Sequence, residues 1–100
     1  MSRLALFILA VTLAAPVAAD QKKTESCGYQ AQVVSAIQQA RLDRVKERDV
    51  PAHILASSPG WPESYNGAIP LLTPWVYEQK RRTIRNQDLG AAWNELCLQQ

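Results

Sequence analysis

Two cysteines place the strongest constraint on how this chain can fold. Cys27 and Cys97 are its only cysteines, and they enclose a loop of about seventy residues. In an exported protein an even number of cysteines normally pairs, and two allow a single intramolecular disulfide. A redox pair usually stands as Cys-x-x-Cys, and a zinc site would need two further ligands, whereas the chain has one histidine. We therefore predict a structural disulfide between Cys27 and Cys97, and no metal site.

The first nineteen residues have the pattern of a secretory signal peptide. Arg3 supplies positive charge, residues 4–15 are apolar apart from Thr12, and Pro16 precedes the small residues at 17–19. An apolar run of about twelve residues is shorter than the roughly 20 that a membrane-spanning helix needs. The sequence therefore predicts cleavage after residue 19 and export to the periplasm or, alternatively, to the outside of the cell. No transmembrane anchor is expected to remain after cleavage.

Removal of residues 1–19 leaves residues 20–100, which are enough for one small domain. We expect residues 20–26, which are polar, to form a flexible tail, and residues 27–100 to form the domain. The chain has eleven Lys and Arg and nine Asp and Glu, a net charge of +2, and loss of Arg3 lowers it to +1. Nucleic-acid-binding proteins usually carry a strong basic excess, so this class is excluded. A domain with so small a core usually needs a covalent cross-link to be stable, and the disulfide would provide one.

The spacing of apolar residues predicts an all-α domain of three to four helices. Residues 27–48 contain no proline and place apolar side chains on one side of a long amphipathic helix. Residues 51–56 predict a short helix that starts at a proline, and residues 74–84 predict a helix that Thr73 caps. A last helix follows from an apolar stripe with i, i+3, i+4 and i+7 spacing, at Leu89, Ala92, Trp93 and Leu96.

A proline-broken connector, Gly60 to Tyr77, joins the two arms of this arrangement. It holds two of the three tryptophans, two of the three tyrosines and three of the six prolines. Aromatic rings offer apolar area with a polar handle, which suits a ligand or partner site. The same rings could instead supply bulk to the core between two helices with narrow apolar faces, and we favour this interpretation. The residues concerned are Trp61, Tyr65, Trp75 and Tyr77.

A cluster of basic charge consists of Lys80, Arg81, Arg82 and Arg85. A solvated helix face with positive charge near its C-terminus would explain it, because such charge complements the helix dipole. The alternative is contact with an acidic envelope protein or another anionic component of the cell envelope. We also expect Trp75 and Arg82 to share a helix face and to stack, since they are seven residues apart. The sequence leaves the identity of any partner open.

Three further arginines continue one edge of the apolar face of the long helix, at Arg41, Arg44 and Arg48. Their stems could cover apolar surface while the guanidinium groups reach water. Alternatively, Arg41 is partly buried and pairs with a carboxylate of the other arm, such as Glu63, Glu78 or Asp88. An anion-binding site is a third interpretation. All three remain open at the level of sequence.

No motif points to catalysis. His53 is the single histidine, no glycine-rich phosphate loop is present, and no Gly-x-Ser-x-Gly elbow occurs. A hydrolase that uses Glu63 or Asp88 with His53 is the least favoured function. We predict no catalytic residues and no cofactor, and hence a protein that is not an enzyme.

In size, export and cysteine count the chain is similar to the small periplasmic acid-stress chaperones. This resemblance extends to no individual motif, so it carries over no residue, but it implies that a chaperone-like role in envelope or acid stress is the alternative function. By elimination, the sequence favours a small exported helical protein of the binding or interaction type.

Overall fold

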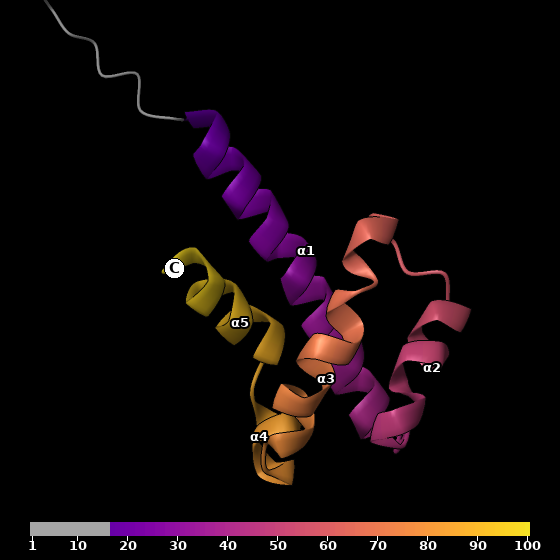
Figure 1. Cartoon of the computed structure of the whole chain (residues 1–100). Coiled ribbons are helices and arrows are strands. Elements are labelled where there is room, and N and C mark those ends of the chain that lie inside the picture. Colours follow the sequence, from indigo (N-terminus) through magenta and orange to yellow (C-terminus); the bar gives the residue numbers. More distant parts are fainter. Residues whose placement is uncertain (1–16) are drawn as a thin grey trace, which may run out of the picture.

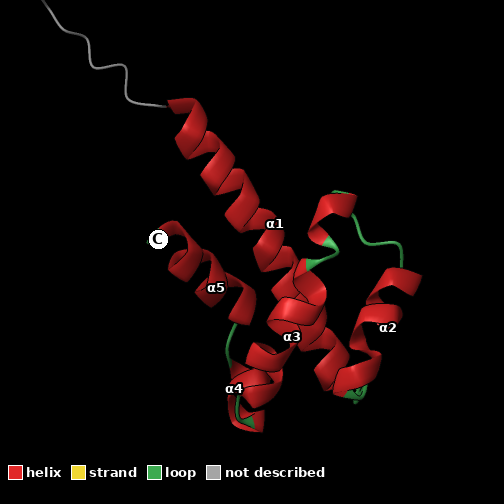
Figure 2. Ribbon diagram, viewed as in Figure 1, coloured by secondary structure: helices red, strands yellow, loops and turns green. Residues whose placement is uncertain are grey.

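The computed structural model describes residues 17–100, which contain helices and loops and no strand (Figure 2). The predicted all-α class is confirmed. The helices are α1 (Val17–Leu42), α2 (Val50–Ala56), α3 (Ala68–Glu78), α4 (Arg81–Asn86) and α5 (Leu89–Leu98), with 3₁₀ turns at Glu47–Asp49 and Glu63–Tyr65 (Figure 1). The predicted signal peptide lies outside the described residues except for residues 17–19, which are in the first turn of α1.

Helix α1 begins earlier than the sequence predicts. Residues 20–26, which we expected to form a flexible tail, are helical in the structure. The physical reason is local: this segment contains no Gly or Pro, is rich in Lys, Gln and Glu, and has Asp20 in the first turn, where a negative charge favours the helix dipole. Lys23 Nζ also donates to the backbone carbonyl of Gln100, which links this end of α1 to the end of the chain.

Helix α1 also ends earlier than the predicted residue 48. Arg44 adopts a left-handed backbone with φ of 63°. The N–H of Val45 donates to the carbonyl of Ala40 and the N–H of Arg44 to the carbonyl of Arg41, each at 3.0 Å. This pair of bonds is the Schellman motif, which satisfies the last carbonyls of a helix and turns the chain away from its axis. The periodic pattern missed this end because arginine is a good helix former.

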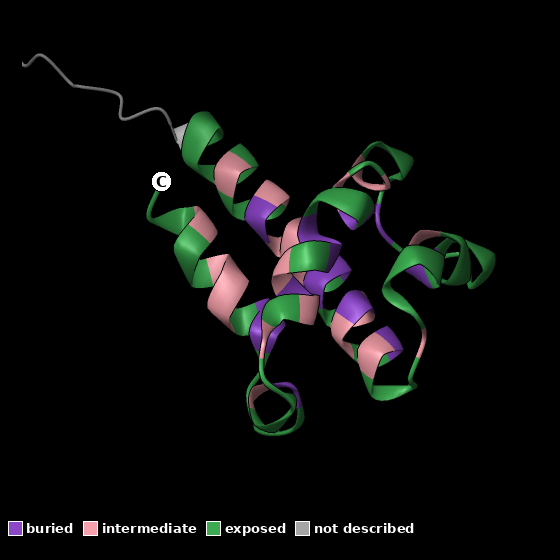
Figure 3. Ribbon diagram, turned by 60° about the horizontal axis from the view of Figure 1, so that its bottom comes forward, coloured by how far each residue is buried: buried purple, intermediate pink, exposed green. Residues whose placement is uncertain are grey.

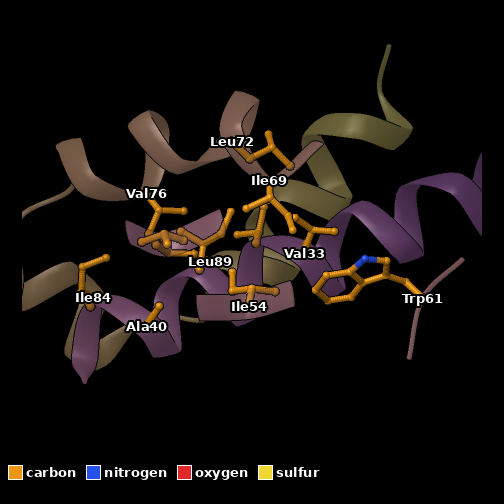
Figure 4. Close-up of a cluster of buried hydrophobic side chains, with 12 residues drawn as sticks. Val33, Ala40, Ile54, Trp61, Ile69, Leu72, Val76, Ile84 and Leu89 are labelled. Carbon is orange, nitrogen blue, oxygen red and sulfur yellow. The ribbon is translucent and has the colours of Figure 1, made fainter. Parts of the chain in front are cut away.

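Most of the core lies along α1, where the other helices cross it (Figures 1 and 3). The apolar face is broader than the predicted stripe, because α3 packs on one side of α1 and α5 on another. The buried cluster spans the domain from Trp61 at one end to Ile84 and Ala40 at the other (Figure 4). Its members are Val33, Val34, Ile37, Ala40, Val50, Ile54, Trp61, Ile69, Leu72, Val76, Ile84 and Leu89.

Helix α3 corrects the prediction of a proline-broken connector. It begins six residues before Pro74, at Ala68, and continues through this proline, which lacks the N–H that a helix interior uses. Thr73, predicted as a cap, is buried within the helix, and its hydroxyl donates to the carbonyl of Ile69 at 2.6 Å. Burial of Ile69 and Val76, both 0% exposed, outweighs the cost of the proline.

The helix predicted over residues 74–84 is two helices. The backbone of Gln79 and Lys80 is extended, with ψ of 148° and 149°, so α3 ends at Glu78 and α4 begins at Arg81. Gln79 stabilises the end of α3, because its side-chain amide donates to the carbonyl of Trp75 at 3.0 Å. Trp75 and Arg82 therefore lie on different helices, and the stacking that we expected between them is wrong.

One glutamine side chain holds the junction between α4 and α5 against α1. Gln38 Nε2 donates to the carbonyls of Ile84 and Gln87, at 2.8 Å each. Gln38 Oε1 accepts from the N–H of Leu89 at 3.1 Å. These bonds satisfy one carbonyl in the last turn of α4, the carbonyl of the residue that follows α4, and the first amide of α5.

The predicted disulfide between Cys27 and Cys97 is confirmed, with their Cα atoms 5.6 Å apart. It joins α5 to the N-terminal half of α1, and these two helices lie side by side in Figure 1. Trp93 strengthens the same contact, since its Nε1 donates to Gln30 Oε1 at 3.0 Å. Asp88 caps α5 by accepting from the N–H of Ala91 at 3.0 Å.

Candidate functional site

The aromatic residues of the central stretch do not gather into one ligand site. Trp61 is 8% exposed and lies in the core, and its Nε1 donates to Asn66 Oδ1 at 2.8 Å. The ring of Tyr65 packs on that of Tyr29, with centroids 5.1 Å apart. The rings of Trp75 in α3 and Trp93 in α5 are tilted at 64° to each other, with centroids 5.3 Å apart. These three aromatic residues therefore take part in packing within the domain, as the core-forming interpretation predicts.

Tyr77 is the fourth aromatic residue of the stretch, and its hydroxyl donates to the carbonyl of Val45 at 2.6 Å. This bond ties the end of α3 to the segment that follows α1. Burial raises the pKa of the Tyr77 hydroxyl above its usual value of 10.0. The nearby positive charge of Arg41 opposes this rise, and the negative charge of Glu47 adds to it.

The raised pKa of Tyr77 predicts a loss of stability in alkali. The folded protein keeps the Tyr77 proton at a pH where the unfolded chain releases it, so the free energy of unfolding should fall as pH rises above 10.0. Spectrophotometric titration should find a tyrosine that ionises above pH 10.0. The Tyr77→Phe variant should lack that transition, and persistence of the transition would assign it to Tyr29 or Tyr65.

Arg41 does not pair with Glu63. Its Nη1 donates to the carbonyl of Val76 at 2.7 Å, and its guanidinium lies 5.6 Å from the centre of the Tyr77 ring. Glu63 is exposed in the turn whose Tyr65 packs on Tyr29, which is twelve residues, or about 18 Å along the helix axis, from Arg41. The alternative of an ion pair between Arg41 and Glu63 is therefore wrong, because the turn that holds Glu63 lies near Tyr29, far along α1 from Arg41.

The structure brings two basic segments together around one groove. The end of α1 forms one wall and α4 forms the other, and the space between them has a volume of about 480 Å³. Figure 1 shows α4 beside the C-terminal end of α1. We call this feature the arginine groove, and it is lined by Arg41, Leu42, Arg44, Val45, Arg81, Ile84 and Arg85.

The charge in the arginine groove is unbalanced. Four of its seven lining residues are arginines, and none is acidic. The carbonyls at the end of α1 do not require these arginines as caps, because the backbone amides of Asp43, Arg44 and Val45 already donate to them. Eight of the eleven Lys and Arg residues of the chain lie within residues 41–48 and 80–85, the two segments that contribute to the groove, and these segments contain two acidic residues, Asp43 and Glu47.

The predicted basic cluster divides into two groups. Arg81 and Arg85 face the arginine groove, whereas Lys80 and Arg82 are exposed and do not line it. Positions 81 and 85 are one helical turn apart and share a face of α4, while position 82 points elsewhere. Only Ile84 of α4 is buried, so this short helix presents most of its charge to solvent or to the groove.

The sequence did not predict that Arg41 and Arg44 line a groove together with α4. The arginines at 41 and 44 were visible as an irregular edge on an apolar helix face, and an anion site was one interpretation. Leu42 and Val45 gave no signal, because they fit a continued helix. The Schellman turn at Arg44 redirects the chain so that these residues and α4 share one space.

Arg44 occupies a backbone conformation that glycine adopts more readily. A non-glycine residue in the left-handed region costs about 1–2 kcal/mol. We therefore expect Arg44→Gly to raise the free energy of unfolding by about 1 kcal/mol in urea denaturation. Arg44→Gln is the control, since it removes the charge and keeps the Cβ atom, and it should give no gain. Equal free energies of unfolding for Arg44→Gly and Arg44→Gln would show that the left-handed backbone at this position is not strained.

The residues considered for a hydrolase have other roles or positions. The carboxylate of Asp88 caps α5, His53 is exposed on α2, and Glu63 lies in the turn that precedes α3. Within residues 17–100 no group of three or more His, Cys, Asp or Glu side chains is arranged to hold a metal ion. In the same part of the chain, no helix combines the length and apolar character needed to cross a membrane.

Comparison of this chain with protein families, with curated proteins and with solved structures returns no match. The geometry and charge of the arginine groove are therefore the features of this chain that indicate a function.

Proposed function

We propose that this protein is a small exported binding protein, acting in the periplasm or outside the cell, and that the arginine groove contacts an anionic group of its ligand or partner. A disulfide across most of the chain is typical of proteins from oxidising compartments, which supports export. The supporting observation for binding is the set of four arginines that line one groove without an acidic neighbour in the lining.

Repulsion explains why this arrangement favours a ligand. Like charges brought to one side of a small domain oppose each other, and an anion between them removes that cost. The arginines come from segments that are about forty residues apart in the sequence, so the fold itself assembles the cluster. Arg41 is already held by the Val76 carbonyl and the Tyr77 ring, and little of its side-chain entropy remains to be lost on binding.

Titration of the purified, disulfide-bonded protein with inorganic pyrophosphate, followed by isothermal calorimetry or NMR, tests this proposal. The double variant Arg81→Gln/Arg85→Gln removes both positive charges that α4 contributes to the groove. We expect it to weaken binding by about tenfold or more, because a hydrogen bond to a charged group contributes about 1.5–3 kcal/mol and each 1.4 kcal/mol is a factor of ten.

The double variant Lys80→Gln/Arg82→Gln is the matched control. It removes the same net charge from exposed positions at and beside the same helix, outside the groove. It should weaken pyrophosphate binding by less than about threefold at an ionic strength near 0.15 M, where exposed charges are largely screened. Equal losses in the two double variants would show a general charge effect and would refute the groove as a binding site.

A further inference from the structure

The chemistry of the arginine groove also specifies a ligand class, an inference that depends on the proposed binding function. We infer that the groove binds a phosphate ester whose phosphate meets the arginines and whose organic part is apolar. Three observations support it: the number of positive charges in the groove, the arrangement of the arginines on two walls, and the apolar residues between them.

The number of charges favours phosphate over a single carboxylate. The four lining arginines carry a charge of +4, because a guanidinium is not deprotonated in proteins. One carboxylate would neutralise a quarter of this charge. A phosphate monoester carries about −1.5 to −2 at neutral pH and presents three terminal oxygens as strong acceptors. It therefore neutralises more charge within the same space.

The positions of the arginines favour the same group. Arg41 and Arg44 come from the end of α1, whereas Arg81 and Arg85 come from the facing side of α4. The two oxygens of a carboxylate lie in one plane and match one guanidinium fork. The oxygens of a phosphate point in tetrahedral directions, so one phosphate can accept from guanidinium groups on both walls.

Arg41 is the arginine whose position the structure holds most firmly. One of its nitrogens donates to the Val76 carbonyl, and the guanidinium lies against the Tyr77 ring. A guanidinium has five N–H donors, so Arg41 keeps donors for a ligand while this anchoring bond is made. The arginines of α4 are exposed and can move to meet a ligand on the opposite wall.

The remaining lining residues are apolar, and they define the second part of the ligand. Leu42 is 43% exposed at the groove, and it lies there with Val45 and with the buried Ile84. A bare phosphate would leave this apolar surface in water, whereas an alkyl or similar group on the ester would cover it. The volume of about 480 Å³ lies within the range of small-molecule sites.

Three soluble probes separate the parts of this inference: hexyl phosphate, inorganic phosphate and hexanoate. We expect hexyl phosphate to bind about tenfold more tightly than either of the others, since only it offers both the phosphate and the apolar group. The Leu42→Asn variant should weaken hexyl phosphate by about fivefold and leave inorganic phosphate unchanged. Leu55→Asn is its control, because Leu55 is 45% exposed on α2 and does not line the groove.

A second arm of the experiment identifies the source of the phosphate ester. Co-sedimentation with vesicles that contain phosphatidic acid, and not with vesicles of phosphatidylcholine alone, would identify lipid headgroups. Binding of hexyl phosphate without vesicle binding would identify a small soluble ester. Both results support the ligand class, provided that Arg81→Gln/Arg85→Gln weakens the binding by about tenfold or more.

The outcomes that overturn this inference differ from those that overturn the binding function. Hexanoate binding as tightly as hexyl phosphate, with loss in the double arginine variant, would leave the groove as an anion site and refute its preference for phosphate. Equal affinities for inorganic and hexyl phosphate would refute the apolar part. Failure of pyrophosphate and of all three probes to bind would refute the proposed function itself.

Discussion

Loss of the disulfide is expected to lower the free energy of unfolding by about 4 kcal/mol, the value that loop-closure entropy gives for a separation of 70 residues. This loss is comparable with the whole stability of many small domains. The double variant Cys27→Ala/Cys97→Ala should therefore be largely unfolded at 37 °C. Urea denaturation followed by circular dichroism measures the effect.

The reduced wild-type protein is the control for this double variant. Reduction opens the same loop and keeps both sulfur atoms, so any difference between the two reports lost packing around Cys27, which is 1% exposed. The free energies of unfolding of the oxidised protein and the double variant could instead differ by less than about 1 kcal/mol. That result would show that contacts between α1 and α5 stabilise the fold without the disulfide.

Introducing a side chain at Gly90 is expected to have the second-largest effect. Gly90 is buried at the start of α5, where a Cβ atom would lie 2.9 Å from the backbone carbonyl oxygen of Ala31 and would overlap Ser35 Oγ. The serine side chain can rotate, but the α1 backbone cannot yield without moving the helix. We expect Gly90→Ala to lower the free energy of unfolding by about 2 kcal/mol, a typical cost of overpacking.

The matched control for Gly90→Ala is the same substitution at Gly28. A Cβ atom there has no neighbour within 4 Å, and Gly28 lies inside α1. Alanine should stabilise the helix at this position by about 0.5–1 kcal/mol, because glycine has the greater backbone entropy in the unfolded chain. The two alanine substitutions should thus have opposite signs. If Gly90→Ala were neutral, the close approach of α5 to α1 would be wrong.

Features that depend on short spacings could be predicted from the sequence. Most of the predicted apolar stripe of the last helix is found, since Leu89 is buried and Trp93 is partly buried, whereas Leu96 at position i+7 is 47% exposed. The helix that starts at Pro51 is found one residue earlier, at Val50. The pairing of Cys27 with Cys97 required no geometry, because two cysteines allow one intramolecular bond.

The boundaries of the helices could not be predicted in the same way. α3 continues through Pro74 because buried neighbours on either side stabilise it, and this gain depends on contact with α1. α1 ends at Leu42 because the chain turns at Arg44, although the local propensity would allow the helix to continue. Local sequence patterns reflect the helix propensity of each segment. The ends of α1 and α3 depend instead on which of their surfaces the rest of the chain buries.

Taken by itself, the sequence determined the helical class, the covalent link and the residues available for a basic surface, since these depend on composition and on spacings within one helix. Only the tertiary structure decided which basic residues act together. It separated Arg41 from Glu63, placed Arg81 and Arg85 opposite the end of α1, and left Lys80 and Arg82 outside. The reason is physical: the groove forms between two segments that are about forty residues apart in the sequence, and no short-range pattern encodes their contact.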